Sequence, residues 1–167
     1  YGIPSTGLRF FTVYGPAGRP DMALFKFTNK LVKGEKIQIF NYGNCKRDFT
    51  YVDDIVTGVI NVMQVAPDEI QTGARYKVYN IGNNKPENLL DFVDILQQEL
   101  VKEHILPENF NFEEHKELLP MQPGDVEKTY ADVSELEADF GFKPCTDLRD
   151  GISRFAKWYY EFYIANK

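Results

Sequence analysis

The sequence lacks the short motifs by which most catalytic centres are recognised. No glycine-rich G-x-G-x-x-G follows a predicted strand, and no P-loop lysine is present. There is also no G-x-S-x-G nucleophile elbow and no H-E-x-x-H zinc motif. We therefore predict neither a catalytic residue nor a metal ligand within this chain.

Cysteine and histidine are scarce, with two of each in 167 residues. Cys45 and Cys145 are too far apart to form a metal-binding or disulfide motif, which is typical of reduced thiols in a cytoplasmic protein. His104 and His115 lie among polar residues and are predicted to be exposed surface histidines. No apolar run approaches the roughly 20 residues of a membrane span, and no signal-peptide pattern appears, so we expect no membrane association.

Basic residues are outnumbered, and the net charge is -6. Nonspecific binding of nucleic acid requires a basic face, so the composition argues against a nucleic-acid partner. An anionic ligand would have to be held by a few local basic groups. Thirteen Phe and ten Tyr argue against disorder and favour a folded, globular chain.

Short β-rich runs alternate with helical patterns, which predicts the α/β class. Two strands are predicted to pair or to flank one loop: 37–40 and 48–52. A buried strand is predicted at 7–13, a further strand at 76–81 and a short strand near 110–112.

Helix signals separate these strands. The predicted helices and their end signals are a helix from Asp21 to Gly34, one capped by Asp53 or Asp54, one capped by Asn88, one from Ser134 to Gly141 and one from about Thr146 to the end. The second of these is predicted to bury a stripe of Ile55, Val56, Val59, Ile60 and Met63.

Two arginines stand in loops at predicted strand ends, where α/β sheets bind ligands. Arg19 follows a Gly-Pro-Ala-Gly loop, and Arg47 follows a turn. A guanidinium suits a phosphate or carboxylate because its planar fork donates two parallel hydrogen bonds. Each could equally pair with a neighbouring acid, Asp21 or Asp48, because ion pairs within loops are common. The residues alone leave both interpretations open.

Other candidate groups carry less information. The loop Met121–Asp125 offers an amide and a carboxylate, and a carboxylate can accept the hydroxyls of a ribose or sugar, although a solvated turn is the simpler interpretation. Two Tyr-x-x-x-Lys spacings, Tyr42 with Lys46 and Tyr163 with Lys167, are judged accidental. The first spans a turn and the second lies at the chain end.

Three segments together resemble a known family. The segments are GLRFFTVYGPAGRPDMALFKF (7–27), KRDFTYVDDIVTGV (46–59) and MQPGDVEKTYADVSELEADFGFKP (121–144). They resemble the extended short-chain dehydrogenase/reductases, the NAD-dependent epimerase/dehydratase family. Within it they look most like the UDP-glucuronate 4-epimerases of polysaccharide synthesis. The resemblance runs the whole length in the family's segment order.

The resemblance also accounts for the missing motifs. In that family the glycine-rich Rossmann turn, the catalytic Ser/Thr and the Tyr-x-x-x-Lys helix precede the strand matched by 7–13. Residues 1–167 would then be a carboxy-terminal sugar-nucleotide-binding half that includes the last strands of a truncated Rossmann sheet, and the amino-terminal NAD-binding half would be absent. The first residue is not Met, which fits that expectation.

The resemblance implies a role for eight residues of this sequence. Gln122 matches the position of a second phosphate-binding arginine in galactose epimerases, and this departure puts a two-arginine clamp in doubt or shifts the second role to Arg19. The remaining roles are Thr12 beside the sugar ring, Arg19 facing the acidic sugar nucleotide, Gln38 and Phe40 on uracil, Arg47 on the UDP phosphates, Asp125 on the uridine ribose, and Phe10, weakly, near the nicotinamide of NAD.

The function implied is interconversion of UDP-glucuronate and UDP-galacturonate. The sugar C4 would be oxidised by NAD, the 4-keto intermediate would rotate, and hydride would return to its other face. A decarboxylase, a 4,6-dehydratase or a non-catalytic UDP-sugar-binding module are the alternatives. The intact enzyme is expected to be a cytoplasmic homodimer. This chain alone is expected to be inactive and to expose apolar surface where half a sheet is missing.

Overall fold

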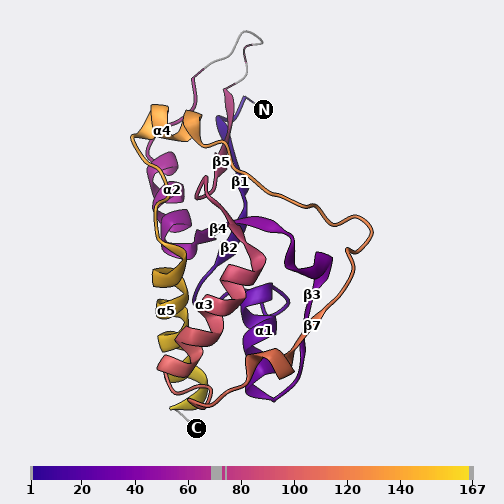
Figure 1. Ribbon diagram of the computed structural model, residues 1–167. Coiled ribbons are helices and arrows are strands. Elements are labelled where there is room, and N and C mark those ends of the chain that lie inside the picture. The colour runs from indigo at the N-terminus through magenta and orange to yellow at the C-terminus, as the bar shows by residue number, and fades with distance from the viewer. Residues whose placement is uncertain (1, 69–72, 74, 166–167) are drawn as a thin grey trace.

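Three small β-sheets form the framework of the described part of the chain (Figure 1). The computed structural model describes residues 2–68, 73 and 75–165. In these sheets β1 pairs in parallel with β5, β4 lies between the parallel β2 and the antiparallel β6, and β3 pairs in parallel with β7. The strands are β1 (Ser5–Phe10), β2 (Thr12–Tyr14), β3 (Ile37–Ile39), β4 (Lys46–Tyr51), β5 (Tyr76–Ile81), β6 (Pro86–Asn88) and β7 (Lys116–Leu118).

Helices cover these sheets, and the α/β class predicted from the alternation is confirmed. Figure 1 shows α2, α4 and α5 along one side of the molecule, while β3 and β7 form a lobe on the opposite side. The helices are α1 (Ala23–Val32), α2 (Val52–Met63), α3 (Leu89–Lys102), α4 (Ser134–Phe140) and α5 (Leu148–Tyr159), with 3-10 turns at Phe40–Gly43 and Phe112–His115 and a π-helical turn at Tyr160–Ile164.

The predicted buried strand at 7–13 is wrong in two respects, because it is two strands in different sheets and none of its residues is fully buried. β1 ends at Phe10 opposite Ile81, and the pairing of β2 with β4 begins at Thr12 opposite Phe49. The chain therefore passes from one sheet to the next at Phe11. A continuous apolar run gives no signal of such a change of partner, because hydrophobic periodicity reports burial rather than pairing.

The remaining strand predictions are correct in part. The strand predicted at 76–81 is confirmed. The runs 37–40 and 48–52 form strands but do not pair with each other, since β3 pairs with β7 and β4 pairs with β2 and β6. The short strand expected near 110–112 is instead β7, at Lys116–Leu118. The sequence separation between β3 and β7 hides this pairing.

Helix ends were predicted better than helix starts. Gly34 and Gly141 follow α1 and α4 with φ of 71° and 59°, the left-handed conformation that favours glycine at a helix end. Asn88 caps α3, because its side chain accepts from the backbone N–H of Leu90 at 2.8 Å. The helix predicted from Thr146 begins at Leu148, with Asp147 as its cap.

Three predicted caps are wrong. The N-cap residues of α1, α2 and α4 are Met22, Tyr51 and Val133, and none of them makes a side-chain capping bond. Asp21 instead pairs with Arg19, and Asp54 accepts from two backbone N–H groups, those of residues 145 and 146. Acidic side chains at these helix starts are thus used for contacts with other groups, although Asp53 and Asp54 still lie favourably in the first turn of α2.

The core consists of two hydrophobic clusters. The larger joins β2, β3 and β4 to α1, α3 and α5, with Phe92 stacked on Phe49 at a centroid distance of 4.5 Å. The smaller lies between β5, α2 and α4, and its buried residues are Ile55, Val62, Tyr79, Ile81 and Leu136. No helix of the described residues is long and apolar enough to cross a membrane.

The buried stripe predicted for α2 is largely wrong. Ile55 is buried, but Val56, Ile60 and Met63 are 49%, 52% and 77% exposed. These three residues are spaced four and three apart, so they share one helix face that no described residue covers. The helical period correctly predicted an apolar face, but part of that face has nothing to pack against here.

Candidate functional site

A cavity of about 250 Å³ lies where β2, β3, β4 and the starts of α1 and α3 meet. Segments from both halves of the chain contribute to it, because β4 brings Arg47 beside the loop that carries Asp125. Its lining residues are Thr12, Met22, Ala23, Phe27, Gln38, Phe40, Cys45, Arg47, Phe49, Leu89 and Asp125. The lining is thus largely apolar with a few polar groups, as in most small-molecule sites.

Five of the eight residues singled out from the sequence line this cavity. They are Thr12, Gln38, Phe40, Arg47 and Asp125. They come from four separate parts of the chain, and the fold brings them together. Gln38 also reaches across the β3–β7 pair, where its side-chain amide donates to Glu117 at 3.4 Å.

The other three lie elsewhere. Arg19 is 75% exposed and forms an ion pair with Asp21 at 2.5 Å, which is the simpler of the two interpretations left open for it. Gln122 is exposed on the loop before Asp125. Phe10 is half exposed at the carboxyl end of β1.

Arg47 does not pair with Asp48, the neighbouring acid that its sequence suggested. Its guanidinium donates to Asp125 Oδ1 at 2.6 Å and to the backbone carbonyl oxygens of Lys46 and Glu127 at 3.0 and 3.4 Å. The two side chains of this ion pair are 18% and 33% exposed, so solvent still reaches both. A planar cation and a carboxylate are therefore held side by side at the rim of an apolar cavity.

The start of α1 adds further donors to the same cavity. Its N-cap Met22 and its first residue Ala23 both line the pocket, and no side chain caps this helix. The first N–H groups of a helix have no partner within the helix, and the helix dipole favours an anion there. Arg47 and the start of α1 are thus two features that suit a phosphate or carboxylate.

Sequence reasoning missed the apolar part of the lining. Cys45, Arg47 and Phe49 alternate along the strand region of β4, so they share one face. That period of two would have identified Phe49 and Cys45 once Arg47 was chosen. Phe27 and Leu89 come from helices, and no local signal in the sequence links them to β4.

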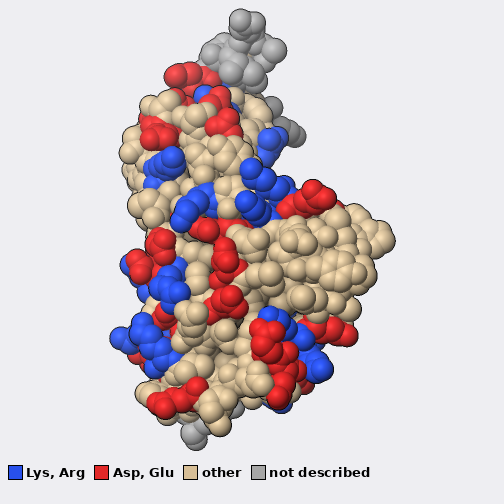
Figure 2. Space-filling view, viewed as in Figure 1, with Lys and Arg blue, Asp and Glu red and all other residues tan. Residues whose placement is uncertain are grey.

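Charged side chains gather beside this region on the surface. Figure 2 shows basic and acidic groups concentrated where the lobe of β3 and β7 meets the rest of the molecule, while most of the visible surface of the lobe carries no charge. A chain of net charge -6 still offers one basic side chain, Arg47, in the lining of its cavity. Among the described residues, no group of three or more His, Cys, Asp and Glu side chains could hold a metal ion.

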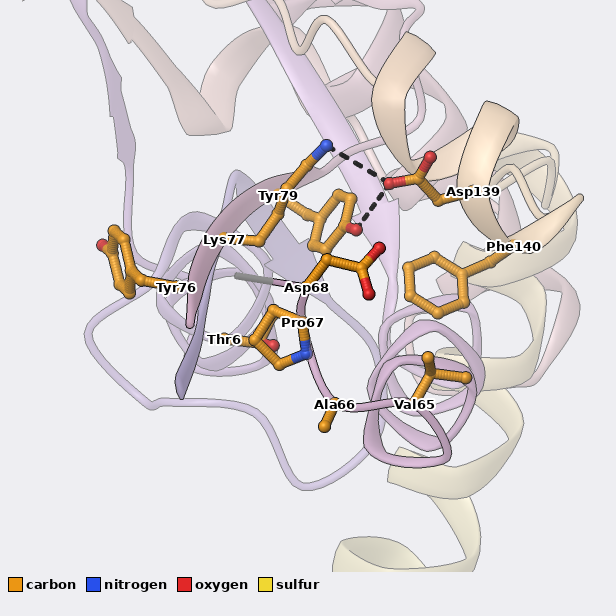
Figure 3. Close-up of a pocket in the computed structure, with 10 residues that line it drawn as sticks. All are labelled: Thr6, Val65, Ala66, Pro67, Asp68, Tyr76, Lys77, Tyr79, Asp139 and Phe140. Carbon is orange, nitrogen blue, oxygen red and sulfur yellow. Dashed lines mark hydrogen bonds and ion pairs between the residues drawn. The ribbon is translucent and has the colours of Figure 1, made fainter. Parts of the chain in front are cut away.

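A larger cavity, of about 470 Å³, lies at the amino ends of β1 and β5 (Figure 3). Asp139 accepts from the Tyr79 hydroxyl at 2.6 Å and pairs with Lys77 at 3.3 Å within it. Burial and this hydrogen bond raise the pKa of Tyr79 to about 12. Open parallel sheets bind ligands at the carboxyl ends of their strands, and this cavity is at the opposite end. Its Lys77 and Asp139 already pair with each other, so the smaller cavity is the better candidate.

The chain matches known proteins over its full length. Residues 1–82 match the family model described as the NAD dependent epimerase/dehydratase family. Protein CapI of Staphylococcus aureus is 47% identical over 174 residues, covering 98% of this chain and 49% of that protein. UDP-glucuronate 4-epimerase 3 of Arabidopsis thaliana is 42% identical over 181 residues, covering 100% of this chain and 39% of that protein. The chain thus spans about half the length of the relatives it matches, or less.

A solved structure is similar in fold. The UDP-glucuronic acid 4-epimerase from Bacillus cereus, crystallised with UDP-glucuronic acid and NAD, superimposes with a TM-score of 0.79 at 29% identity. The match covers 96% of this chain and 46% of that one. The fold is accordingly that of the carboxy-terminal part of Rossmann-type epimerase/dehydratase structures.

Proposed function

We propose that this chain, which belongs to the NAD-dependent epimerase/dehydratase family, is the UDP-sugar-binding half of a nucleotide-sugar 4-epimerase that interconverts UDP-glucuronate and UDP-galacturonate. The observation that carries the proposal is the convergence of Thr12, Gln38, Phe40, Arg47 and Asp125 on one cavity. The resemblance of the sequence assigns each of them to a part of a UDP-sugar. Relatives that carry the name UDP-glucuronate 4-epimerase support the choice of sugar.

The proposed binding mode uses polar groups from each of the segments that line the cavity. Gln38 and Phe40, on β3 and the turn after it, contact uracil, and Asp125 accepts from the ribose hydroxyls. Arg47 and the first backbone N–H groups of α1 bind the diphosphate. Thr12, at the start of β2, lies beside the sugar. Binding of the nucleotide far from the reacting carbon holds the sugar in place while it turns, so binding energy at UDP supports chemistry at C4.

NAD is part of the proposal for the longer protein. Phe10 is the one residue of this chain assigned to it, and its half-exposed ring at the carboxyl end of β1 fits a contact there, because such sheets bind nucleotide cofactors at that end. When bound, the cofactor would supply hydride transfer at C4. The described residues of this chain would bind and orient the substrate. The free thiols Cys45 and Cys145 fit the cytoplasmic location proposed with this function.

Incubation of UDP-glucuronate and NAD with the longest protein that the gene encodes tests the proposal. NMR of the product should show UDP-galacturonate. Loss of C6 would identify a decarboxylase, and a 6-deoxy-4-keto sugar would identify a 4,6-dehydratase, so either product contradicts the epimerase. We expect the 167-residue chain alone to bind UDP without turnover. A folded chain that does not bind UDP would contradict the assignment of the cavity.

A further inference from the structure

The nucleotide pocket depends on a loop segment that has no regular secondary structure of its own. Asp125 lies on it, and the segment from Glu127 to Ala131 then runs along β4. Backbone bonds attach it at its start, from Lys46 N to Glu127 O at 2.8 Å and from Thr129 N to Lys46 O at 3.1 Å. The attachment of the far end of this segment therefore bears on how Asp125 faces Arg47.

Asp48 supplies that attachment. It follows Arg47 on β4, and successive strand residues point to opposite faces, so its side chain faces away from the pocket. Its Oδ2 accepts from Ala131 N at 2.8 Å, and its own backbone N–H donates to Thr129 Oγ1 at 2.9 Å. Asp48 therefore attaches the segment of residues 127–131 to β4 at two points beyond the backbone pairing.

The same carboxylate also attaches the turn between β5 and β6. Asn83 N donates to Oδ1 at 2.8 Å and Asn84 N donates to Oδ2 at 3.1 Å. Asp48 is fully buried, and burial of a carboxylate is costly unless hydrogen bonds replace its water. Here three backbone N–H donors from two distant segments replace that water. Hydrogen bonds to a charged acceptor are stronger than those between neutral groups.

The close approach of the segments at this point is specific. A Cβ added to Gly82 would lie 2.3 Å from the Cβ of Ala131 and 3.3 Å from Asp48 Oδ2. The turn, the carboxylate and the segment of residues 127–131 are thus packed without room for a further methyl group. A change at Asp48 therefore has little room to be absorbed at this junction.

We infer that Asp48 is a positioning residue for the nucleotide site: it holds the 127–131 segment so that Asp125 meets both Arg47 and the ribose hydroxyls. This inference rests on the proposed function for its ligand and on the hydrogen bonds of Asp48 for its geometry. It predicts that Asp48 controls the contribution of the ribose hydroxyls to binding, although it touches no part of the nucleotide.

The ratio of the affinities for UDP and 2′-deoxy-UDP separates this role from a merely structural one. Calorimetry on the 167-residue chain should show that UDP binds about tenfold or more tightly than 2′-deoxy-UDP. This factor is the scale of a hydrogen bond to a charged group. Asp48→Asn should bring that ratio close to one, because Asp125 is no longer held at the ribose. If Asp48 only stabilised the fold, a folded Asp48→Asn protein would bind both nucleotides more weakly by the same factor, and that unchanged ratio would overturn the inference.

Two further variants complete the test, one as an independent change and one as a control. Thr129→Val removes one of the two Asp48 attachments with little change of volume, so it should lower the ratio even if Asp48→Asn does not fold. Asp54→Asn is the matched control, because Asp54 also accepts from two backbone N–H groups, but these belong to residues 145 and 146 and not to the segment that carries Asp125. It should leave the ratio unchanged, and an equal drop in this control would contradict a specific role for Asp48.

Hydrogen exchange distinguishes failure of this inference from failure of the proposed function. If the wild-type chain binds neither nucleotide, the UDP assignment fails, but the attachment can still be measured. Exchange of backbone amides in residues 121–131 should then be faster in Asp48→Asn and Thr129→Val than in the wild type and in Asp54→Asn. Unchanged exchange in both variants would overturn the positioning role.

Discussion

The two hydrophobic clusters differ in how completely this chain covers them. The larger cluster, between β2, β3, β4 and helices α1, α3 and α5, is enclosed by its own elements and supports the candidate pocket. The smaller cluster, between β5, α2 and α4, lies beside the exposed face of Val56, Ile60 and Met63. Its two-stranded sheet of β1 and β5 has no further strand among the described residues.

The difference separates two tasks. The region of the larger cluster carries the groups assigned to the nucleotide, and those groups are fixed by contacts within this chain. The region of the smaller cluster offers an apolar helix face and strand edges that are suited to contact with another surface. Stability and nucleotide binding should therefore respond to changes in the first region, and association should respond to changes in the second.

The largest expected effect is on stability, from Phe92→Ala. Phe92 is fully buried in the larger cluster and stacks on Phe49, which lines the pocket. Its truncation should lower the free energy of unfolding by about 3–5 kcal/mol, measured by denaturant titration. Val56→Ala, on the exposed face of α2, should change it by less than about 0.5 kcal/mol. Equal losses would contradict the contrast between the regions.

Nucleotide binding should come next, through Arg47. Arg47→Ala should weaken UDP binding by about 2–3 kcal/mol, the scale of a hydrogen bond to a charged group. Arg19→Ala is the control within the same chain, because Arg19 lies outside the cavity and is paired with Asp21. Calorimetry that finds equal affinities for wild type and Arg47→Ala would remove Arg47 from the phosphate role.

Acid should weaken the larger region through Glu99, which joins α3 to α5. Burial alone would raise the pKa of Glu99, but hydrogen bonds from Lys102, Ser153 and Arg149 outweigh it and lower the pKa. A lowered pKa stabilises the fold above the ordinary pKa of a glutamate, and that stability is lost as pH falls through the folded value. Glu99→Gln should cost about 1–3 kcal/mol at pH 7 and should reduce the loss between about pH 5 and pH 3. Parallel pH profiles of the free energy of unfolding for the two proteins would contradict this.

The smallest effect on stability, but the largest on association, is expected at α2. The isolated chain should self-associate through Val56, Ile60 and Met63, and Ile60→Lys should shift it toward the monomer in sedimentation velocity with an unchanged circular dichroism spectrum. The free energy of unfolding should change by only about 0.5 kcal/mol. Val32→Lys, at the exposed end of α1, is the control and should leave association unchanged. A wild-type chain that is already monomeric would contradict the prediction.

The sequence predicted local features well and long-range pairing poorly. The ends of α1 and α4 at Gly34 and Gly141 follow from the left-handed conformation that glycine permits. The pairing of β3 with β7 could not be predicted, because β7 lies far along the chain in a segment with no strand pattern. The exposure of Ile60 and Met63 could not be predicted either, because a helical period identifies an apolar face but does not indicate what covers it.

The candidate site shows the same difference between local features, which the sequence predicts, and long-range contacts, which it does not. Arg47 and Asp125 could be assigned from the resemblance of their segments, and their proximity was implied only by a shared ligand. The fold adds that they bind each other at 2.6 Å. Asp48 was considered only as a possible partner of Arg47, because no sequence pattern indicates that a buried carboxylate accepts from Asn83, Asn84 and Ala131.

The Arg47–Asp125 ion pair has a kinetic consequence. Before a nucleotide arrives, each charge largely cancels the field of the other at distances beyond a few ångströms, so the pair attracts a distant dianion only weakly. Charges that are neutralised in the free protein contribute little to electrostatic steering, even when they contribute to the bound state. The lifetime of the nucleotide complex, rather than its rate of formation, should therefore be the quantity that this pair sets.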